Sequence, residues 1–137
     1  MEFHLGRLLD HVHLRVADVE RSKRFYAAVL GTLGLKITHE FPGAFAADEL
    51  FVDEADDYVT RVHLAFQAAD QDAVRRFHEA ALANGGTDNG PPGERSYHPG
   101  YYAAFALDPD GNNIEAVYHG PSTRSAASVV VTAQEGT

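Results

Sequence analysis

The sequence contains no cysteine. This absence excludes disulfide bonds, thiolate nucleophiles, thiolate zinc sites and iron–sulfur clusters. Chemistry in this chain therefore depends on histidine, carboxylate, tyrosine and hydroxyl side chains. Histidine is unusually frequent, with eight residues in a chain of 137, and imidazole is both a common metal ligand and a general base near neutral pH.

Basic residues and long apolar runs are also scarce. The chain has 11 Lys and Arg against 20 Asp and Glu, for a formal charge of −9. The basic residues form no stripe, so we expect no nucleic-acid partner. No apolar stretch approaches the roughly 20 residues that span a bilayer, so we expect no membrane segment. The N-terminal sequence MEFHLGRLLDHVHLRV lacks the continuous apolar core of a secretory signal, and we expect a cytoplasmic protein.

The chain repeats itself. Residues 11–34 align with residues 63–86 at a constant offset of 52, without gaps. The matched pairs include His11 with His63, Asp18 with Asp70, Phe25 with Phe77 and Gly34 with Gly86. Such a register indicates duplication of a supersecondary unit. We predict a single domain over residues 1–125, built from modules at about 8–60 and 61–120, and a C-terminal tail at 126–137.

Each module is predicted to begin with a strand and a helix. Val12, Leu14 and Val16 alternate as in a strand, and Asp18 and Asp70 stand where helix N-caps are expected. Shorter strands follow, at 35–41 and 50–52 in the first module and at 101–107 and 113–118 in the second. The fold class is therefore α+β. Residues 87–100 are rich in Gly and Pro and are predicted to be a loop, either a binding loop or a surface excursion.

Three residues form a candidate metal-binding set. His11 and His63 begin equivalent strands of the repeat, so approximate two-fold symmetry would bring them together. Glu115 lies in the middle of an apolar strand, and a buried glutamate is rare unless it is paired or binds a metal. Two histidines and one carboxylate suit a divalent ion with open positions for water and substrate.

The phrases HVHLRVADVERSKRFYAAVLG, HLAFQAAD and ALDPDGNNIEAV resemble the vicinal oxygen chelate superfamily over about residues 8–119. This superfamily includes glyoxalase I, extradiol dioxygenases, and bleomycin- and fosfomycin-resistance proteins. The resemblance implies two tandem βαβββ modules that form a curved mixed sheet around a divalent metal ion, whether Fe, Mn, Co, Ni or Zn. It implies His11, His63 and Glu115 as ligands. A fourth ligand often comes from the last strand of the first module, where Glu49 and Phe51 compete for the position.

The resemblance also suggests residues with catalytic roles. The dioxygenase branch has a histidine where this chain has His98, but it has a tyrosine where this chain has Phe105, which argues against ring cleavage. His13 lies on the same strand face as His11 and could line the pocket or orient a ligand. Tyr97, Tyr101 and Tyr102 could stack on or hydrogen-bond an aromatic or oxygenated substrate, and Tyr102 is taken as the catalytic candidate. Arg15 stands where glyoxalase I has an arginine that holds glutathione, although relatives that do not use glutathione share it.

The sequence leaves two functions from different classes open. The first is a metal-dependent enzyme that acts on a small oxygen-bearing substrate by stabilising an oxyanion or enolate, as a lyase, an isomerase or a dioxygenase. The second is a binding protein of the bleomycin-resistance type that sequesters a drug or metabolite without catalysis. A homodimer is expected in either case, and the metal site lies within one chain or is shared between two.

Overall fold

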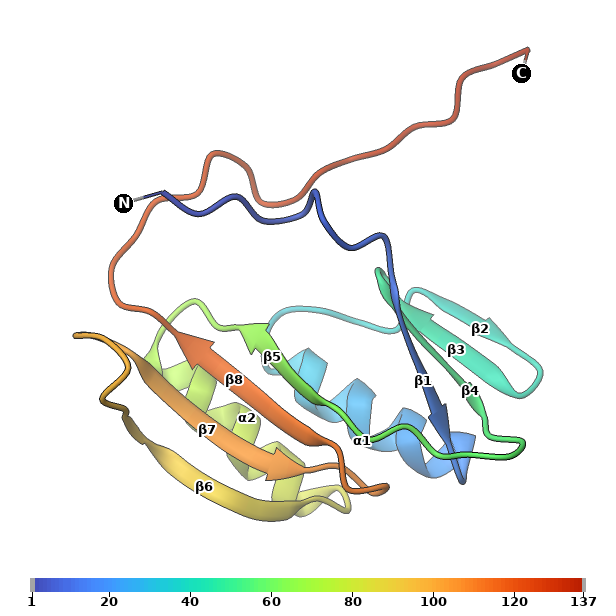
Figure 1. Cartoon of the computed structure of the whole chain (residues 1–137), viewed down its shortest axis with the longest axis horizontal. Coiled ribbons are helices and arrows are strands. Elements are labelled where there is room, and N and C mark those ends of the chain that lie inside the picture. The colour runs from blue at the N-terminus through green and yellow to red at the C-terminus, as the bar shows by residue number, and fades with distance from the viewer. Residues whose placement is uncertain (1, 137) are drawn as a thin grey trace.

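The structure is a computed structural model that describes residues 2–136. Its elements form two successive modules of one strand, one helix and three strands (Figure 1). The first module contains β1 (Val12–Val16), α1 (Val19–Gly31), β2 (His39–Phe41), β3 (Ala44–Ala47) and β4 (Leu50–Glu54). The second contains β5 (His63–Gln67), α2 (Gln71–Ala83), β6 (Thr87–Glu94), β7 (Tyr102–Leu107) and β8 (Asn113–Tyr118). The predicted α+β class and the two βαβββ modules are confirmed.

Each module forms its own mixed four-stranded sheet. The strand order is β1-β4-β3-β2 in the first sheet and β5-β8-β7-β6 in the second. The first strand of each module pairs in parallel with the last, and the remaining pairs are antiparallel. Strands β1 and β5 lie between the outer strands β2 and β6 and point in nearly opposite directions (Figure 1).

The two helices begin where the repeat predicts. The Asp18 carboxylate accepts a hydrogen bond from the amide of Arg21 at 3.1 Å, and Asp70 accepts one from Ala73 at 2.7 Å. Each aspartate thus satisfies an amide that would otherwise lack a partner in the first turn, as an N-cap does. None of the helices within residues 2–136 is long and apolar enough to cross a membrane.

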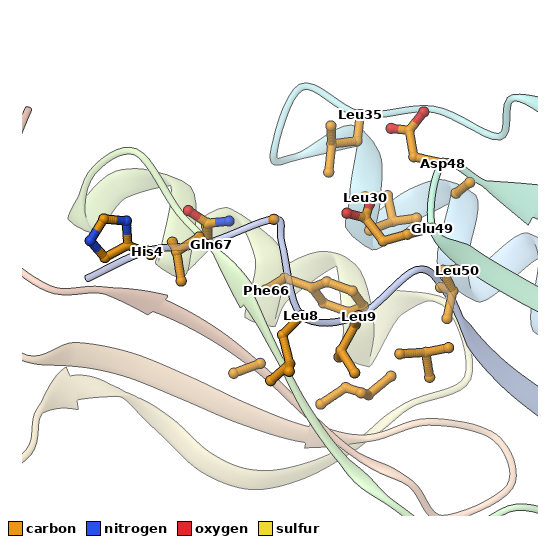
Figure 2. A pocket seen from close by; sticks show the side chains of 16 residues that line it. His4, Leu8, Leu9, Leu30, Leu35, Asp48, Glu49, Leu50, Phe66 and Gln67 are labelled. Atoms are coloured by element: carbon orange, nitrogen blue, oxygen red, sulfur yellow. The ribbon is translucent and has the colours of Figure 1, made fainter. Parts of the chain in front are cut away.

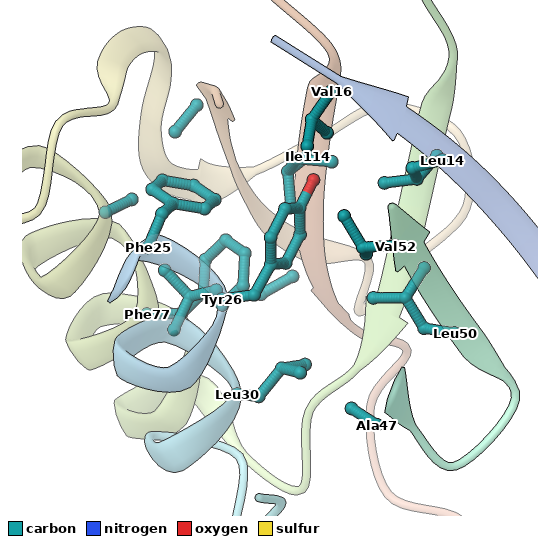
Figure 3. Packing of buried hydrophobic residues seen from close by; sticks show 14 of the residues in the cluster. Leu14, Val16, Phe25, Tyr26, Leu30, Ala47, Leu50, Val52, Phe77 and Ile114 are labelled. Atoms are coloured by element: carbon teal, nitrogen blue, oxygen red, sulfur yellow. The ribbon is translucent and has the colours of Figure 1, made fainter. Parts of the chain in front are cut away.

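A single core joins the two modules. Helices α1 and α2 pack against each other and cover one face of both sheets. Figure 3 shows the ring of Tyr26 on α1 among apolar side chains that include Phe77 of α2 and Ile114 of β8. The close fit extends to Gly86, where an added Cβ would lie only 2.9 Å from the Phe25 ring. The opposite face of each sheet is left uncovered by helices.

A polar contact reinforces the junction. The buried hydroxyl of Tyr26 donates a hydrogen bond to Oδ2 of Asp108 at 2.6 Å. Asp108 begins the turn between β7 and β8, and its Oδ1 accepts from the amides of Asp110 and Asn112. Burial, followed by the negative charge of Asp108, raises the pKa of Tyr26 well above its usual value. The DPDGNN turn thus fixes the second module to the first helix.

The prediction of a loop at 87–100 was wrong for its first part. Residues 87–94 form β6, which pairs with β7 through two register shifts, near Gly90 and Gly93. Pro91 and Pro92 cannot donate backbone hydrogen bonds, but proline is tolerated on an edge strand and at bulges. The residues of the short strand β3 were also not located by the sequence pattern. In the tail, Val129, Val130 and Val131 are exposed and form no strand.

Candidate functional site

The uncovered face of the second sheet carries a histidine–carboxylate pair. Strands β5 and β8 are in register with Ala65 opposite Glu115, and His63 points to the same face two residues earlier. Nε2 of His63 lies 2.7 Å from Oε1 of Glu115. Glu115 is only 2% exposed, whereas the His63 side chain is 52% exposed. The pair therefore combines a buried carboxylate with an imidazole that solvent can reach.

A tyrosine holds the second oxygen of the same carboxylate. The hydroxyl of Tyr101 donates a hydrogen bond to Oε2 of Glu115. Burial, followed by this hydrogen bond to an anionic group, raises the pKa of Tyr101 above its usual value. The predicted Tyr102 points to the helix side, where its hydroxyl accepts a hydrogen bond from Arg75 of α2 at 3.1 Å. The phenol that reaches Glu115 is therefore that of Tyr101.

His98 lies beside this group. Its ring centroid is 5.3 Å from that of Tyr101, in an edge-to-face arrangement. His98 also contacts His119, which follows β8, with Nε2 of His98 2.9 Å from Nδ1 of His119. The structure thus places the predicted His98 next to the His63–Glu115 pair, separated from it by the Tyr101 ring.

The first module carries a related pair, shifted along the strand. Nε2 of His13 lies 2.7 Å from Oδ1 of Asp53, on the face of the first sheet that the helices leave open. The repeat aligns His13 with Ala65, and the strand partners of these residues are Phe51 and Glu115. Phe51 is therefore the structural counterpart of Glu115.

This register resolves the competition between Glu49 and Phe51. Glu49 lies in the turn before β4, outside the position equivalent to that of Glu115. Its backbone carbonyl accepts a hydrogen bond from Val12. The first module thus offers no carboxylate at this position, and Asp53 stands two residues further along the same face.

One chain does not bring the three predicted metal ligands together. His11 contacts Asp10, with Nδ1 2.7 Å from Oδ1, and its side chain is exposed. His11 directly precedes β1 and His63 begins β5, and these two strands run in nearly opposite directions (Figure 1). Within residues 2–136, no three His, Asp or Glu side chains converge closely enough to hold a metal ion. His63 and Glu115 are the two predicted ligands that meet.

The predicted Arg15 is already engaged by side chains of its own module. Its guanidinium lies 3.1 Å from Asp56 and 3.7 Å from Asp53, and it stacks over the ring of Tyr58. Arg15 therefore supports the carboxylate that holds His13.

A separate cavity of about 450 Å³ lies between the N-terminal segment, the start of β1, the turn before β4, and β5. Figure 2 shows its lining, which is mainly apolar and includes Leu8 and Leu9 of the N-terminal segment, Leu50 and Phe66. Asp48 and Glu49 contribute the acidic groups of this lining. The cavity contains neither the His63–Glu115 nor the His13–Asp53 pair.

Sequence reasoning missed two residues of these clusters, His119 and Asp53. It named Tyr101 together with Tyr97 and Tyr102 but chose Tyr102 as the catalytic candidate, whereas Tyr101 is the residue that contacts Glu115. Neither His119 nor Asp53 belongs to a recognisable sequence motif. Asp53 could have been found, because it lies two residues after Phe51 and side chains two residues apart share one face of a strand.

Comparisons with known proteins agree with this architecture. The model of the glyoxalase/bleomycin resistance protein/dioxygenase superfamily matches residues 8–116. A crystal structure of a glyoxalase/bleomycin resistance protein from Albidiferax ferrireducens T118 is 33% identical, with a TM-score of 0.72, and the match covers 80% of this chain and 97% of that one. No curated protein matches the chain.

More distant structures share the fold. A glyoxalase-related enzyme from Fulvimarina pelagi is 21% identical, with a TM-score of 0.66, and the match covers 88% of this chain and 100% of that one. A glyoxalase/bleomycin resistance protein/dioxygenase family enzyme from Burkholderia phytofirmans PsJN is also 21% identical, with a TM-score of 0.64 and coverage of 79% and 95%. The extent of the family match and the 33% identity of the first structure carry the assignment. The chain belongs to the glyoxalase/bleomycin resistance protein/dioxygenase superfamily.

Proposed function

We propose that the protein is a metal-dependent enzyme that acts on a small oxygen-bearing substrate in the cytoplasm. His63 and Glu115 of one subunit and His11 of a second subunit would bind a divalent ion, which is Fe, Mn, Co, Ni or Zn. The proposed reaction is of the lyase or isomerase type, with dioxygenation as the other class that the family suggests. The homodimer is part of the proposal, because one chain supplies only two of the three ligands.

The buried carboxylate of Glu115 is the observation that carries this proposal. Burying a carboxylate is costly unless charge and hydrogen bonds compensate for the lost water. Glu115 has such compensation from His63 and Tyr101, on a sheet face that no helix covers. A strand that required only packing would carry an apolar residue there, as Phe51 shows at the equivalent position of the first module.

The donor set fits a divalent ion. Imidazole and carboxylate together suit borderline divalent metals. Tyr101 hydrogen-bonds the second oxygen of Glu115, and metal-binding side chains usually have such a partner that fixes their orientation. In the free protein Nε2 of His63 donates its hydrogen to Glu115, so metal binding at Nε2 would require the neutral ring to carry its hydrogen on Nδ1 instead. When bound, the metal would act as a Lewis acid on substrate oxygens.

The second subunit is needed for geometric reasons. Within one chain the two modules pack together through their helices. The open sheet faces that carry His13 and His63 do not form a common metal site within residues 2–136. A second copy that placed the open face of its first module over that of the second module would bring His11 toward His63 and Glu115. The assembly would have two-fold symmetry and two equivalent sites.

Proton transfer in this proposal belongs to the histidines around the metal ligands. Asp53 accepts a hydrogen bond from Nε2 of His13, which leaves Nδ1 of the neutral ring as a base. His98 lies on the other module, beside Tyr101, and both of its ring nitrogens are engaged, one of them with His119. We assign the phenol of the site to Tyr101 in place of Tyr102, because Tyr102 contacts α2.

Sequestration of a ligand without catalysis is the second candidate function. The apolar cavity of about 450 Å³ supports it, because cavities of this size and composition commonly hold small molecules. This function needs no metal, so metal binding separates the two candidates.

Elemental analysis of protein purified without chelators or affinity-tag metal tests the proposal. We expect near-stoichiometric divalent metal in the wild type and its loss in both His63→Ala and Glu115→Ala. His39→Ala is the matched control, because His39 is an exposed strand histidine whose ring nitrogen contacts only Thr38 among the described residues. The proposal fails if the folded wild type neither retains metal nor rebinds added Mn, Fe, Co, Ni or Zn.

A further inference from the structure

His98 and His119 form a pair whose proton positions can be deduced. Nδ1 of His98 lies 2.8 Å from the carbonyl oxygen of Pro99, and Nε2 lies 2.9 Å from Nδ1 of His119. The two rings are nearly parallel, with an interplanar angle of 19° and centroids 5.1 Å apart. Both side chains are exposed, so solvent or a bound molecule can reach them.

The carbonyl of Pro99 fixes the first proton. A carbonyl oxygen only accepts hydrogen bonds, so Nδ1 of His98 must carry a hydrogen. In the neutral ring, Nε2 of His98 then holds the lone pair. The contact with His119 requires one donor, and Nδ1 of His119 must therefore supply it. The lone pair of neutral His119 is left on Nε2, which makes no hydrogen bond within residues 2–136.

His98 therefore has no free nitrogen to offer a substrate. We propose that His98 and His119 act as one proton-holding pair, in which Nε2 of His119 is the atom that exchanges protons and His98 is its positioning residue. When a proton binds at Nε2 of His119, the hydrogen on Nδ1 of His119 moves to Nε2 of His98. One N–H bond forms and one breaks inside the pair, and the positive charge comes to rest on His98, stabilised by the carbonyl of Pro99.

The surroundings connect this pair to the candidate metal site. The ring of Tyr101 lies edge-on to both imidazoles, at 5.3 Å from His98 and 5.1 Å from His119, and its hydroxyl binds Glu115. The pair therefore borders the same face as His63 and Glu115. His98 and His119 line a second, open hollow between the N-terminal segment and the C-terminal tail. The other ionisable side chains that line this hollow are Glu2, His4, Asp10, Asp48, Glu49, Tyr118 and Arg124.

This role rests on the proposed function, but the pair itself can be tested in metal-free protein. Long-range ¹H–¹⁵N correlation spectra at mildly alkaline pH report which ring nitrogen carries hydrogen. We expect hydrogen on Nδ1 of both His98 and His119 in the wild type. In His98→Ala, His119 should lose this preference, whereas His119→Ala should leave hydrogen on Nδ1 of His98, because Pro99 still holds it.

Two further variants sharpen the test. His98→Gln should restore hydrogen on Nδ1 of His119, because its amide oxygen can accept in place of the imidazole nitrogen. His39→Ala, at an exposed histidine of β2 outside this hollow, should leave the ring-nitrogen signals of both His98 and His119 unchanged. Finding the His119 hydrogen on Nε2 in the wild type, or the same tautomer with and without His98, would overturn the inference.

Chemical modification gives an independent readout. Diethyl pyrocarbonate attacks unprotonated imidazole nitrogens, so peptide mapping should show His119 modified and His98 protected in the wild type. Modification of His98 should become several-fold faster in His119→Ala, where its Nε2 is released. Equal rates of His98 modification in the two proteins would contradict the pair, while leaving the metal proposal standing.

Discussion

The hydroxyl of Tyr101 holds Oε2 of Glu115, while His63 contacts Oε1 of the same carboxylate. The two residues would have different roles at this buried carboxylate. Tyr101 would support the site, and His63 would bind the metal. Tyr101 fixes the orientation of the carboxylate, and His63 marks the side on which an ion would be held.

Replacing Tyr101 by phenylalanine should weaken the site without removing a ligand. Oε2 of Glu115 would lose its donor in a buried setting, which should cost about 1–2 kcal/mol of unfolding free energy. Loss of a residue that hydrogen-bonds a metal ligand typically lowers metal affinity by about 10- to 100-fold. Chemical denaturation and metal titration by calorimetry measure the two effects.

Tyr102→Phe is the matched control for this prediction. Its hydroxyl contacts the exposed Arg75 side chain on the helix side, so metal affinity should stay at the wild-type value. If the two phenylalanine variants bound metal equally well, Tyr101 would have no special part in the site.

Phe51→Glu should create a fourth ligand. Phe51 is the counterpart of Glu115 in the strand register, on the open face of the first module. A carboxylate there adds negative charge and a hard donor to the proposed shared site, so we expect affinity for Mn²⁺ to rise by about tenfold or more. Competition with a chelating dye measures the change.

Phe51→Gln separates charge from size in this experiment. A neutral amide of similar length should give a smaller gain than glutamate. An affinity that did not rise in Phe51→Glu would mean that the first module does not face the metal.

Tyr26→Phe should change the response of stability to alkaline pH. At neutral pH the variant loses a buried hydrogen bond to Asp108, at a cost of about 1–3 kcal/mol. The folded state raises the pKa of Tyr26 above its unfolded value near 10.0. The wild-type advantage is therefore complete below about pH 10 and is lost as pH rises toward the raised pKa.

Urea denaturation of both proteins across this range measures the difference in unfolding free energy. The gap between wild type and variant should be constant from pH 7 to about pH 9 and should narrow above pH 10. A gap that widened with alkaline pH would show that ionised Tyr26 is favoured in the folded state, contrary to the structure.

Much of the fold could be predicted because its signals are local or repeated. The offset of 52 residues identified two equivalent modules, and Asp18 and Asp70 located the helix starts within one residue. Segment 87–94 was different, because its glycines and prolines resemble a loop. Only pairing with β7, a non-local contact, makes this segment a strand.

The site was partly predictable for a similar reason. Glu115 stood out as a charge within an apolar strand, and His63 as half of a repeated pair. Whether His11 meets His63 and Glu115 depends on how the two modules are arranged. Within one chain the modules pack through their helices, and His11 does not reach the other two residues. Tyr101 could be named only as one of three tyrosines, and His119 was not predictable, since the contacts of both depend on side chains from distant parts of the sequence.

Mixing subunits tests the shared metal site most directly. His11→Ala and Glu115→Ala each damage both sites of a homodimer, so each protein alone should contain little metal. The two variants would be unfolded together in equal amounts, refolded with the metal found in the wild type, and analysed for bound metal beside each parent treated alone. In a mixed dimer, one site would carry both substitutions and the other would carry neither.

Random reassembly should therefore restore roughly a quarter of the wild-type sites, because half of the dimers are mixed and each has one intact site of two. Recovery near this level in the mixture, and in neither parent, is the result that a shared site predicts. Metal content in the mixture no greater than the average of the parents, or full metal retention by His11→Ala, would contradict it.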